Sequence, residues 1–124
     1  MPLEALKATA VQFLQLASAG RVEEAYASVA PDFRHHNPFF ACNASALKAA
    51  MQDNALKNPD KIFEVQQTIS EGQMVVVHSK VQMPSKAITV SVVHIFRFES
   101  GQIAELWDIG QPQPTDMPNE LGMF

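Results

Sequence analysis

The feature that most constrains the fold is a change in hydrophobic period near residue 60. Before this point, apolar residues recur every three or four positions, which is typical of helices with one buried face. Beyond it, segments rich in β-branched residues alternate with short turns, as expected for strands. The expected strands cover residues 62–70, 73–83, 87–98 and 102–109. Helices followed by strands predict an α+β domain, in which helices cover one face of a curved antiparallel sheet.

Three helices are expected before the change of period. They cover about residues 3–19, 22–29 and 44–54. Gly20 can end the first helix in the left-handed conformation. Pro31 stops the second, because proline disfavours helical backbone in the residue before it. Asn43 is a suitable N-cap for the third, which ends before the Asn-Pro-Asp turn.

The composition fits one folded domain over residues 1–124, because 47% of the residues are hydrophobic and 18% are charged. A net charge of -4 without any basic run argues against nucleic acid or an anionic membrane as a partner. Cys42 is the single cysteine, which excludes an internal disulfide and fits a reducing cytoplasm. The N-terminal segment carries charges within its apolar pattern, so we expect neither a signal peptide nor a membrane span.

Alternation along the third strand places one histidine, His94, on an apolar face. That face also carries Ile88, Val90, Val92, Phe96 and Phe98. The turn at 99–101 sets what His94 can meet on the next strand. A three-residue loop with its glycine left-handed places His94 opposite Leu106 and diagonal to Asp108. A two-residue turn would pair His94 with Trp107 and send Asp108 to the other face. The glycine at the third loop position favours the first register.

An aspartate beside a histidine in an apolar cavity can act as a general acid or base. Each residue also has a structural interpretation. His94 could be a core histidine satisfied by one hydrogen bond. Asp108 could be a strand-end residue that binds backbone amides. Both interpretations stay open at this point.

The corner FRHHNPFF, at residues 33–40, carries two adjacent histidines. Neighbours on an extended segment point to opposite sides, and we expect His36 to face inward and His35 outward. A metal site built from Asp108 and two of His36, His78 and His94 is a less favoured alternative, because the histidines lack a local metal-ligand spacing. The direction of His78 is undecided.

Two stretches, AYASVAPDFRHHNP and HIFRFESGQIAELWDIGQPQP, resemble the nuclear transport factor 2-like superfamily and, within it, the SnoaL-like polyketide cyclase group. The resemblance implies a cone-shaped α+β barrel with a deep apolar pocket and a homodimer formed through the outer sheet face. In these cyclases a pocket carboxylate serves as acid and base for an intramolecular aldol condensation, without metal or organic cofactor. The matching positions are Asp108 for the carboxylate and His36 for the corner histidine.

The ketosteroid isomerase branch of the same superfamily is a poorer match. Asn37 stands where that branch has its general-base aspartate, and His94 stands where it has a proton-donating carboxylic acid. An amide cannot accept a proton at neutral pH, so isomerisation of that type is not expected.

The expected function is therefore cofactor-independent acid/base chemistry on a small apolar carbonyl compound. Asp108 would move the proton, and His36 or His94 would hold the enolate oxygen. The expected lining residues are Tyr26, Asn37, Phe40, His78, Phe96, Leu106 and Trp107. The alternative is a protein of the same fold that only binds a small molecule or a partner subunit. The proline-rich tail, residues 111–124, is a candidate lid because its apolar side chains could dock on the cavity mouth.

Overall fold

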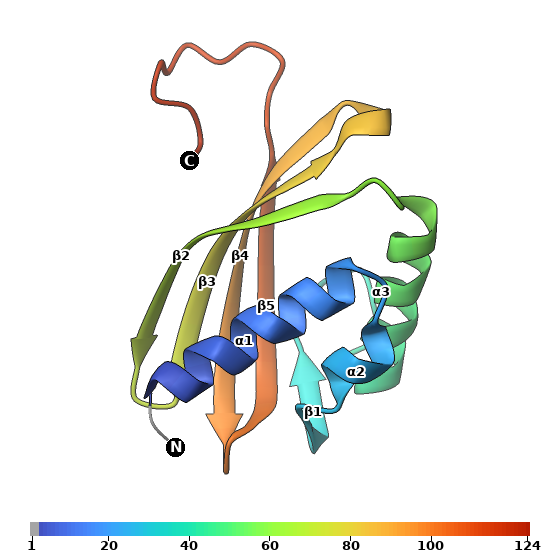
Figure 1. Ribbon diagram of the computed structural model, residues 1–124, viewed down its shortest axis with the longest axis vertical. Helices are drawn as coiled ribbons and strands as arrows, with labels where there is room; N and C mark the ends of the chain where they lie inside the picture. The colour runs from blue at the N-terminus through green and yellow to red at the C-terminus, as the bar shows by residue number, and fades with distance from the viewer. Residues whose placement is uncertain (1–2) are drawn as a thin grey trace.

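The computed structural model describes residues 3–124 and contains three helices and a curved five-stranded sheet (Figure 1). The elements are α1 (Leu3–Ser18), α2 (Val22–Tyr26), β1 (Val29–His35), α3 (Ala44–Lys57), β2 (Ile62–Glu71), β3 (Met74–Met83), the short 3-10 helix η1 (Pro84–Lys86), β4 (Ile88–Glu99) and β5 (Gln102–Pro112). The strand order is β1-β5-β4-β3-β2. The sheet is open, so the expected barrel does not close. The predicted α+β class, with helices packed on one face of the sheet, is confirmed.

The first strand, β1, is the element that the sequence pattern did not predict. The second helix ends at Tyr26, and residues 29–35 pair parallel with β5, with His35 opposite Leu106. β1 is the edge of the sheet, where Pro31 is tolerated because its missing N–H breaks no inner ladder. The sheet is therefore mixed and mostly antiparallel.

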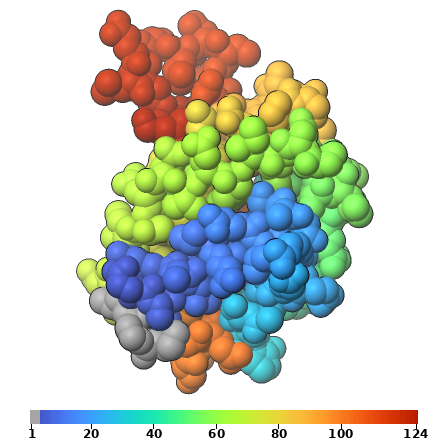
Figure 2. Space-filling model, viewed as in Figure 1, coloured from blue at the N-terminus to red at the C-terminus, as the bar shows by residue number. Residues whose placement is uncertain are grey.

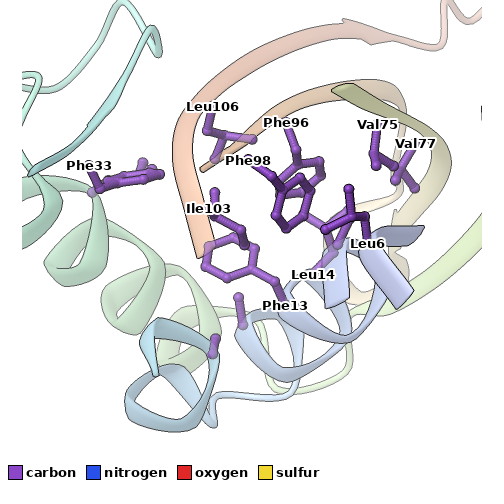
Figure 3. Packing of buried hydrophobic residues seen from close by; sticks show 14 residues of the cluster. Leu6, Phe13, Leu14, Phe33, Val75, Val77, Phe96, Phe98, Ile103 and Leu106 are labelled. Atoms are coloured by element: carbon purple, nitrogen blue, oxygen red, sulfur yellow. The ribbon is translucent and has the colours of Figure 1, made fainter. Parts of the chain in front are cut away.

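The core lies between α1 and the concave face of the sheet (Figure 3). Phe13 of α1 packs edge-on against Phe96 of β4, with ring centroids 5.9 Å apart and planes at 82°. Phe96 and Leu106 are fully buried in this cluster and do not line the pocket described below. Their expected place in the pocket wall is therefore corrected.

A bulge in the β4–β5 hairpin sets the register. Glu99 pairs with Gln102 across a two-residue turn, Ser100-Gly101, in which both residues have positive φ. The predicted three-residue loop is wrong. Ala104 is then an extra residue, because Phe98 pairs with Ile103 while Arg97 pairs with Glu105. Without the bulge, the two-residue turn would place Asp108 on the opposite face of the sheet from His94. The extra residue shifts the register by one position, so Asp108 lies on the same face as His94 and directly opposite it.

The tail after β5 projects beyond the end of the sheet that carries η1 (Figure 2). Phe124 returns to the outer face, where its ring stacks on His78 with centroids 5.8 Å apart, beneath Lys80 Nζ at 5.2 Å. In the part of the chain that the structure describes, no tail residue lines the pocket, so the expected lid is not observed. Among residues 3–124, no helix is long and apolar enough to cross a membrane.

Candidate active site

A cavity of about 260 Å³ lies between the helices and the sheet. Its apolar wall includes Leu14, Ala17, Phe40, Leu47, Ala50, Met51, Phe63, Val81 and Val92. Its polar groups come from Ser18, Asn37, Asn54, Lys61, His94 and Asp108. A mainly apolar wall with a few polar groups is typical of small-molecule sites, and the volume lies near the lower end of their usual range.

Asp108 and His94 form the polar centre of this cavity. The two residues face each other across the β4–β5 ladder, and His94 Nε2 lies 3.7 Å from Asp108 Oδ1. The side chain of His94 is 9% exposed and that of Asp108 is 22% exposed. The carboxylate can therefore be reached from the cavity, while the imidazole is almost completely enclosed.

Asn37 holds the second oxygen of the carboxylate. Its Nδ2 group donates to Asp108 Oδ2 at 3.0 Å, and its Oδ1 accepts from the Phe39 N–H at 3.0 Å. The second bond fixes which way the amide points. The corner is itself attached to β5, because the His36 N–H donates to the Leu106 carbonyl at 2.9 Å. Asp108 is thus oriented by a corner of the chain that is remote in sequence.

Burial controls the charge of His94. Desolvation lowers the pKa of His94 and outweighs the opposing attraction of the Asp108 carboxylate. The imidazole is therefore neutral at neutral pH. Its Nδ1 is buried and has no hydrogen-bond partner within the described range. We place the proton on Nε2, because an N–H toward the carboxylate is more favourable than a lone pair.

The two corner histidines have the reverse of their expected orientations. His35 is 3% exposed, donates from Nε2 to the Ala41 carbonyl at 2.6 Å and accepts the Asn37 N–H on Nδ1 at 3.1 Å. His36 is 46% exposed and lies on the outer face of the sheet. The expectation that His36 faces the cavity is wrong, because the bonds of the corner need the His35 ring inside.

His36 takes part in a polar cluster on the outer face. Its ring stacks on Trp107 with centroids 4.9 Å apart, and its Nε2 bonds Glu105 Oε2 at 2.6 Å. Arg97 Nε donates to the other oxygen of Glu105 at 3.0 Å. The hydrogen bond from His36 is the largest of several contacts that lower the pKa of Glu105. Trp107 thus lies opposite the cavity, and its expected place in the pocket wall is corrected.

Sequence comparison identifies the family of this chain. The model of the SnoaL-like polyketide cyclase family matches residues 8–115. The chain belongs to the SnoaL-like polyketide cyclase family. No curated protein gives a significant sequence match.

Solved structures show that the SnoaL-like fold is shared with proteins of different names. AclR from Streptomyces galilaeus, a proposed hydroxylase, is similar with a TM-score of 0.78 and 17% identity, covering 89% of this chain and 91% of that one. TsrD from Streptomyces laurentii has a TM-score of 0.75 and 20% identity, covering 90% and 91%. A proposed ketosteroid isomerase from Kribbella flavida DSM 17836 has a TM-score of 0.74 and 18% identity, covering 98% and 96%. At these identities the likeness concerns the fold alone.

Two further residues expected in the pocket of this SnoaL-like chain lie elsewhere. Tyr26 is packed between Phe13 and Phe33, its hydroxyl donates to Met51 Sδ at 3.4 Å, and burial raises its pKa. It serves as a packing aromatic. His78 lies on the outer face, where Nε2 bonds Ser91 Oγ at 2.9 Å. Asn37 and Phe40 do line the cavity, together with His94 and Asp108.

The arrangement does not bring the histidines together as metal ligands. His36 and His78 lie on the outer face, while His94 and Asp108 lie inside. Among residues 3–124 no group of three or more His, Cys, Asp or Glu side chains could hold a metal ion.

Sequence reasoning missed several wall residues, of which Lys61 and Phe63 are the most informative. Both are partly buried and alternate with exposed Ile62 and Glu64. Period-two alternation from the start of β2 could have found them. Among the described residues that line the cavity, Lys61 is the one with a positively charged side chain.

The lowered pKa of His94 makes a testable prediction about stability. A histidine whose pKa falls on folding stabilises the native state above its unfolded pKa of about 6.5, and this contribution is lost as pH falls toward the folded value. Urea unfolding should show a steeper loss of stability from neutral to acidic pH in the wild type than in His94→Gln, by up to about 1.4 kcal/mol per pH unit. Gln66→Ala, at an exposed position of β2 that carries no titrating group, should keep the wild-type slope. If the free energy of unfolding changed with pH at the same slope in the wild type and in His94→Gln, this would contradict a buried neutral imidazole at position 94.

Proposed function

We propose that the cavity is the active site of a cofactor-independent proton transfer on a small carbonyl compound, with Asp108 as acid and base. One observation carries this proposal. A carboxylate opens into the cavity with one oxygen held by Asn37 and the other facing a neutral histidine. A general base needs both orientation and access to its substrate, and this arrangement supplies both.

In the proposed chemistry, Asp108 moves the proton and His94 stabilises the enolate. The carboxylate takes a proton from the carbon next to a ketone, and the C–H electron pair moves toward the carbonyl oxygen to form an enolate. The N–H of His94 would donate to that oxygen as its charge develops. In a cyclisation, the enolate carbon then forms a C–C bond with a second carbonyl of the same molecule. The new alkoxide takes the proton back from Asp108, so the enzyme is regenerated.

The neighbourhood of Asp108 supports this assignment over isomerisation of the ketosteroid type. Asn37 donates a hydrogen bond to Asp108, and its amide cannot accept a proton. Of these two residues, only Asp108 can therefore act as the base. His36 lies on the outer face and takes no part. The family description, SnoaL-like polyketide cyclase, agrees with an aldol reaction but does not specify the substrate.

The proposal is tested by deuterium exchange in the wild-type protein. Methyl 4-oxo-4-phenylbutanoate is a compact aryl ketone with exchangeable protons next to its carbonyl. We expect the protein to accelerate exchange of this methylene in heavy water, followed by NMR. Binding of the ketone with exchange at the buffer rate would support the alternative, a protein that binds a small molecule without catalysis.

We further propose a cytoplasmic homodimer that associates through an outer patch, defined as Ile69, Val76, Val93, Ile95, Trp107 and Ile109. The patch crosses four strands, because Ile69 pairs with Val76, Val76 with Ile95, and Ile95 with Trp107. Ile69 and Ile109 are each 59% exposed. Apolar side chains gathered across a sheet face are a common basis for a symmetric interface. The single cysteine, exposed Cys42, suits a reducing compartment.

A further inference from the structure

A second charged group, Lys61, lines the cavity in addition to Asp108. Lys61 lies directly before β2 and is partly buried, and Asn54 of α3 lines the same cavity. In the sheet, β3 and β4 separate β2 from the strand of Asp108. None of the ion pairs within residues 3–124 involves Lys61. The cavity therefore contains a cation and an anion that do not neutralise each other by direct contact.

The hydrogen bonding of Lys61 leaves capacity for a ligand. Its ammonium donates to Asn54 Oδ1 at 2.5 Å, and this is its single acceptor among the described side chains and carbonyls. An ammonium carries three N–H donors, so two are available. Because Asn54 accepts through Oδ1, its Nδ2 group can donate beside the ammonium. Together they offer several donors and a positive charge on one part of the wall.

The backbone around Lys61 is fixed before any ligand binds. The Lys61 N–H donates to the Asn58 carbonyl at 3.1 Å. Asn58 is buried, and its Nδ2 group donates to the Asn54 carbonyl at 2.9 Å. The turn between α3 and β2 is thus attached to the helix that carries Asn54. A preorganised donor group binds with a smaller loss of conformational entropy.

The environment of Lys61 differs from that of Lys57 and Lys48, the two lysines of α3. Lys57 and Lys48 each contact a carboxylate, Asp53 at 2.9 Å and Glu23 at 2.7 Å. Lys61 is partly desolvated instead, and this burial lowers its pKa. Desolvation of a cation with a neutral partner is unfavourable, and a bound anion would relieve it.

We propose that Lys61 and Asn54 form an anion-binding subsite, so that the ligand of the cavity is an apolar carbonyl compound that also carries a carboxylate. This inference rests on the proposed function, because the same molecule would present its ketone to Asp108. Most of the remaining cavity wall is apolar, with Leu14, Phe63 and Val92 among its residues. A molecule that carries a ketone and a carboxylate on an apolar body matches this lining.

The test compares 4-oxo-4-phenylbutanoate with its neutral methyl ester. Calorimetry should give about tenfold tighter binding of the carboxylate to the wild type, since hydrogen bonds to a charged group are the stronger ones. Lys61→Met removes the charge and keeps an apolar stem. It should reduce the preference to about twofold or less while leaving ester affinity nearly unchanged. Lys57→Met, at a surface lysine outside the cavity wall, should keep the full preference.

The outcomes separate the subsite from the proposed chemistry. The subsite would be overturned if Lys61→Met preferred the carboxylate over the ester as strongly as the wild type does. It would also be overturned if neither compound bound at millimolar concentration. Loss of the preference in Lys61→Met supports the subsite even if neither compound exchanges deuterium, in which case the proton-transfer role of Asp108 fails alone. If the protein accelerated deuterium exchange of the ester but Lys61→Met kept the preference for the carboxylate, the proposed proton transfer would be supported and the subsite would be rejected.

Discussion

Asp108→Asn should lower the protein-catalysed deuterium exchange of the ketone by about 10²- to 10⁴-fold, the usual contribution of a positioned acid or base. Asparagine has nearly the same shape and cannot take the proton. The new side chain can still accept from Asn37 through its oxygen, so the corner should keep its place. Affinity for the neutral methyl ester should therefore change by about threefold or less. Exchange by NMR and binding by calorimetry measure the two effects separately.

The matched control for this substitution is Asp32→Asn. Asp32 lies exposed on β1 and undergoes the same chemical change outside the cavity. Its exchange rate should equal that of the wild type. Exchange that survives in Asp108→Asn at the wild-type rate would contradict the assignment of Asp108 as the base.

Ile109→Glu should dissociate the proposed homodimer. Ile109 belongs to the outer patch, where it pairs with Val93, and its side chain is 59% exposed in the single chain. In a symmetric interface each substitution occurs twice, and each carboxylate would be buried without a partner at a cost of several kcal/mol. We expect the dissociation constant of the dimer to rise by about 100-fold or more. Sedimentation velocity over a concentration series measures this change.

Leu56→Glu is the control for the outer patch. Leu56 is 83% exposed on α3, which lies on the opposite face of the sheet from Ile109. The variant should remain as dimeric as the wild type. A dimer that persists in Ile109→Glu would place the interface on another surface.

The period change near residue 60 was enough to predict four strands and three helices, because alternation and helical spacing are local properties of the chain. β1 was missed because residues 29–35 contain Pro31, and their partner, β5, lies far along the sequence. Periodicity carries no information about such a parallel partner. The same limit explains the bulge at Ala104, which the choice of turn alone does not reveal.

The site shows which side-chain orientations a sequence can determine. Alternation placed His94 on the apolar face, where the structure has it. It also required that His35 and His36 point to opposite sides, but it could not say which one is inside. Which histidine lies inside depends on two contacts: the Ala41 carbonyl accepts a hydrogen bond from His35, and the ring of His36 stacks on Trp107. These contacts form only when the corner is folded against β5.

A crystal structure of Asp108→Asn with 4-oxo-4-phenylbutanoate bound would locate the reacting carbon of the ligand relative to position 108. We expect the methylene next to the ketone to lie about 3.5 Å or less from the side chain at position 108, close enough for proton transfer in the wild type. The ligand carboxylate should lie beside Lys61. A ligand bound away from position 108, on the outer face or in the surface groove lined by Gln52 and Leu56, would contradict the assignment of this cavity as the active site.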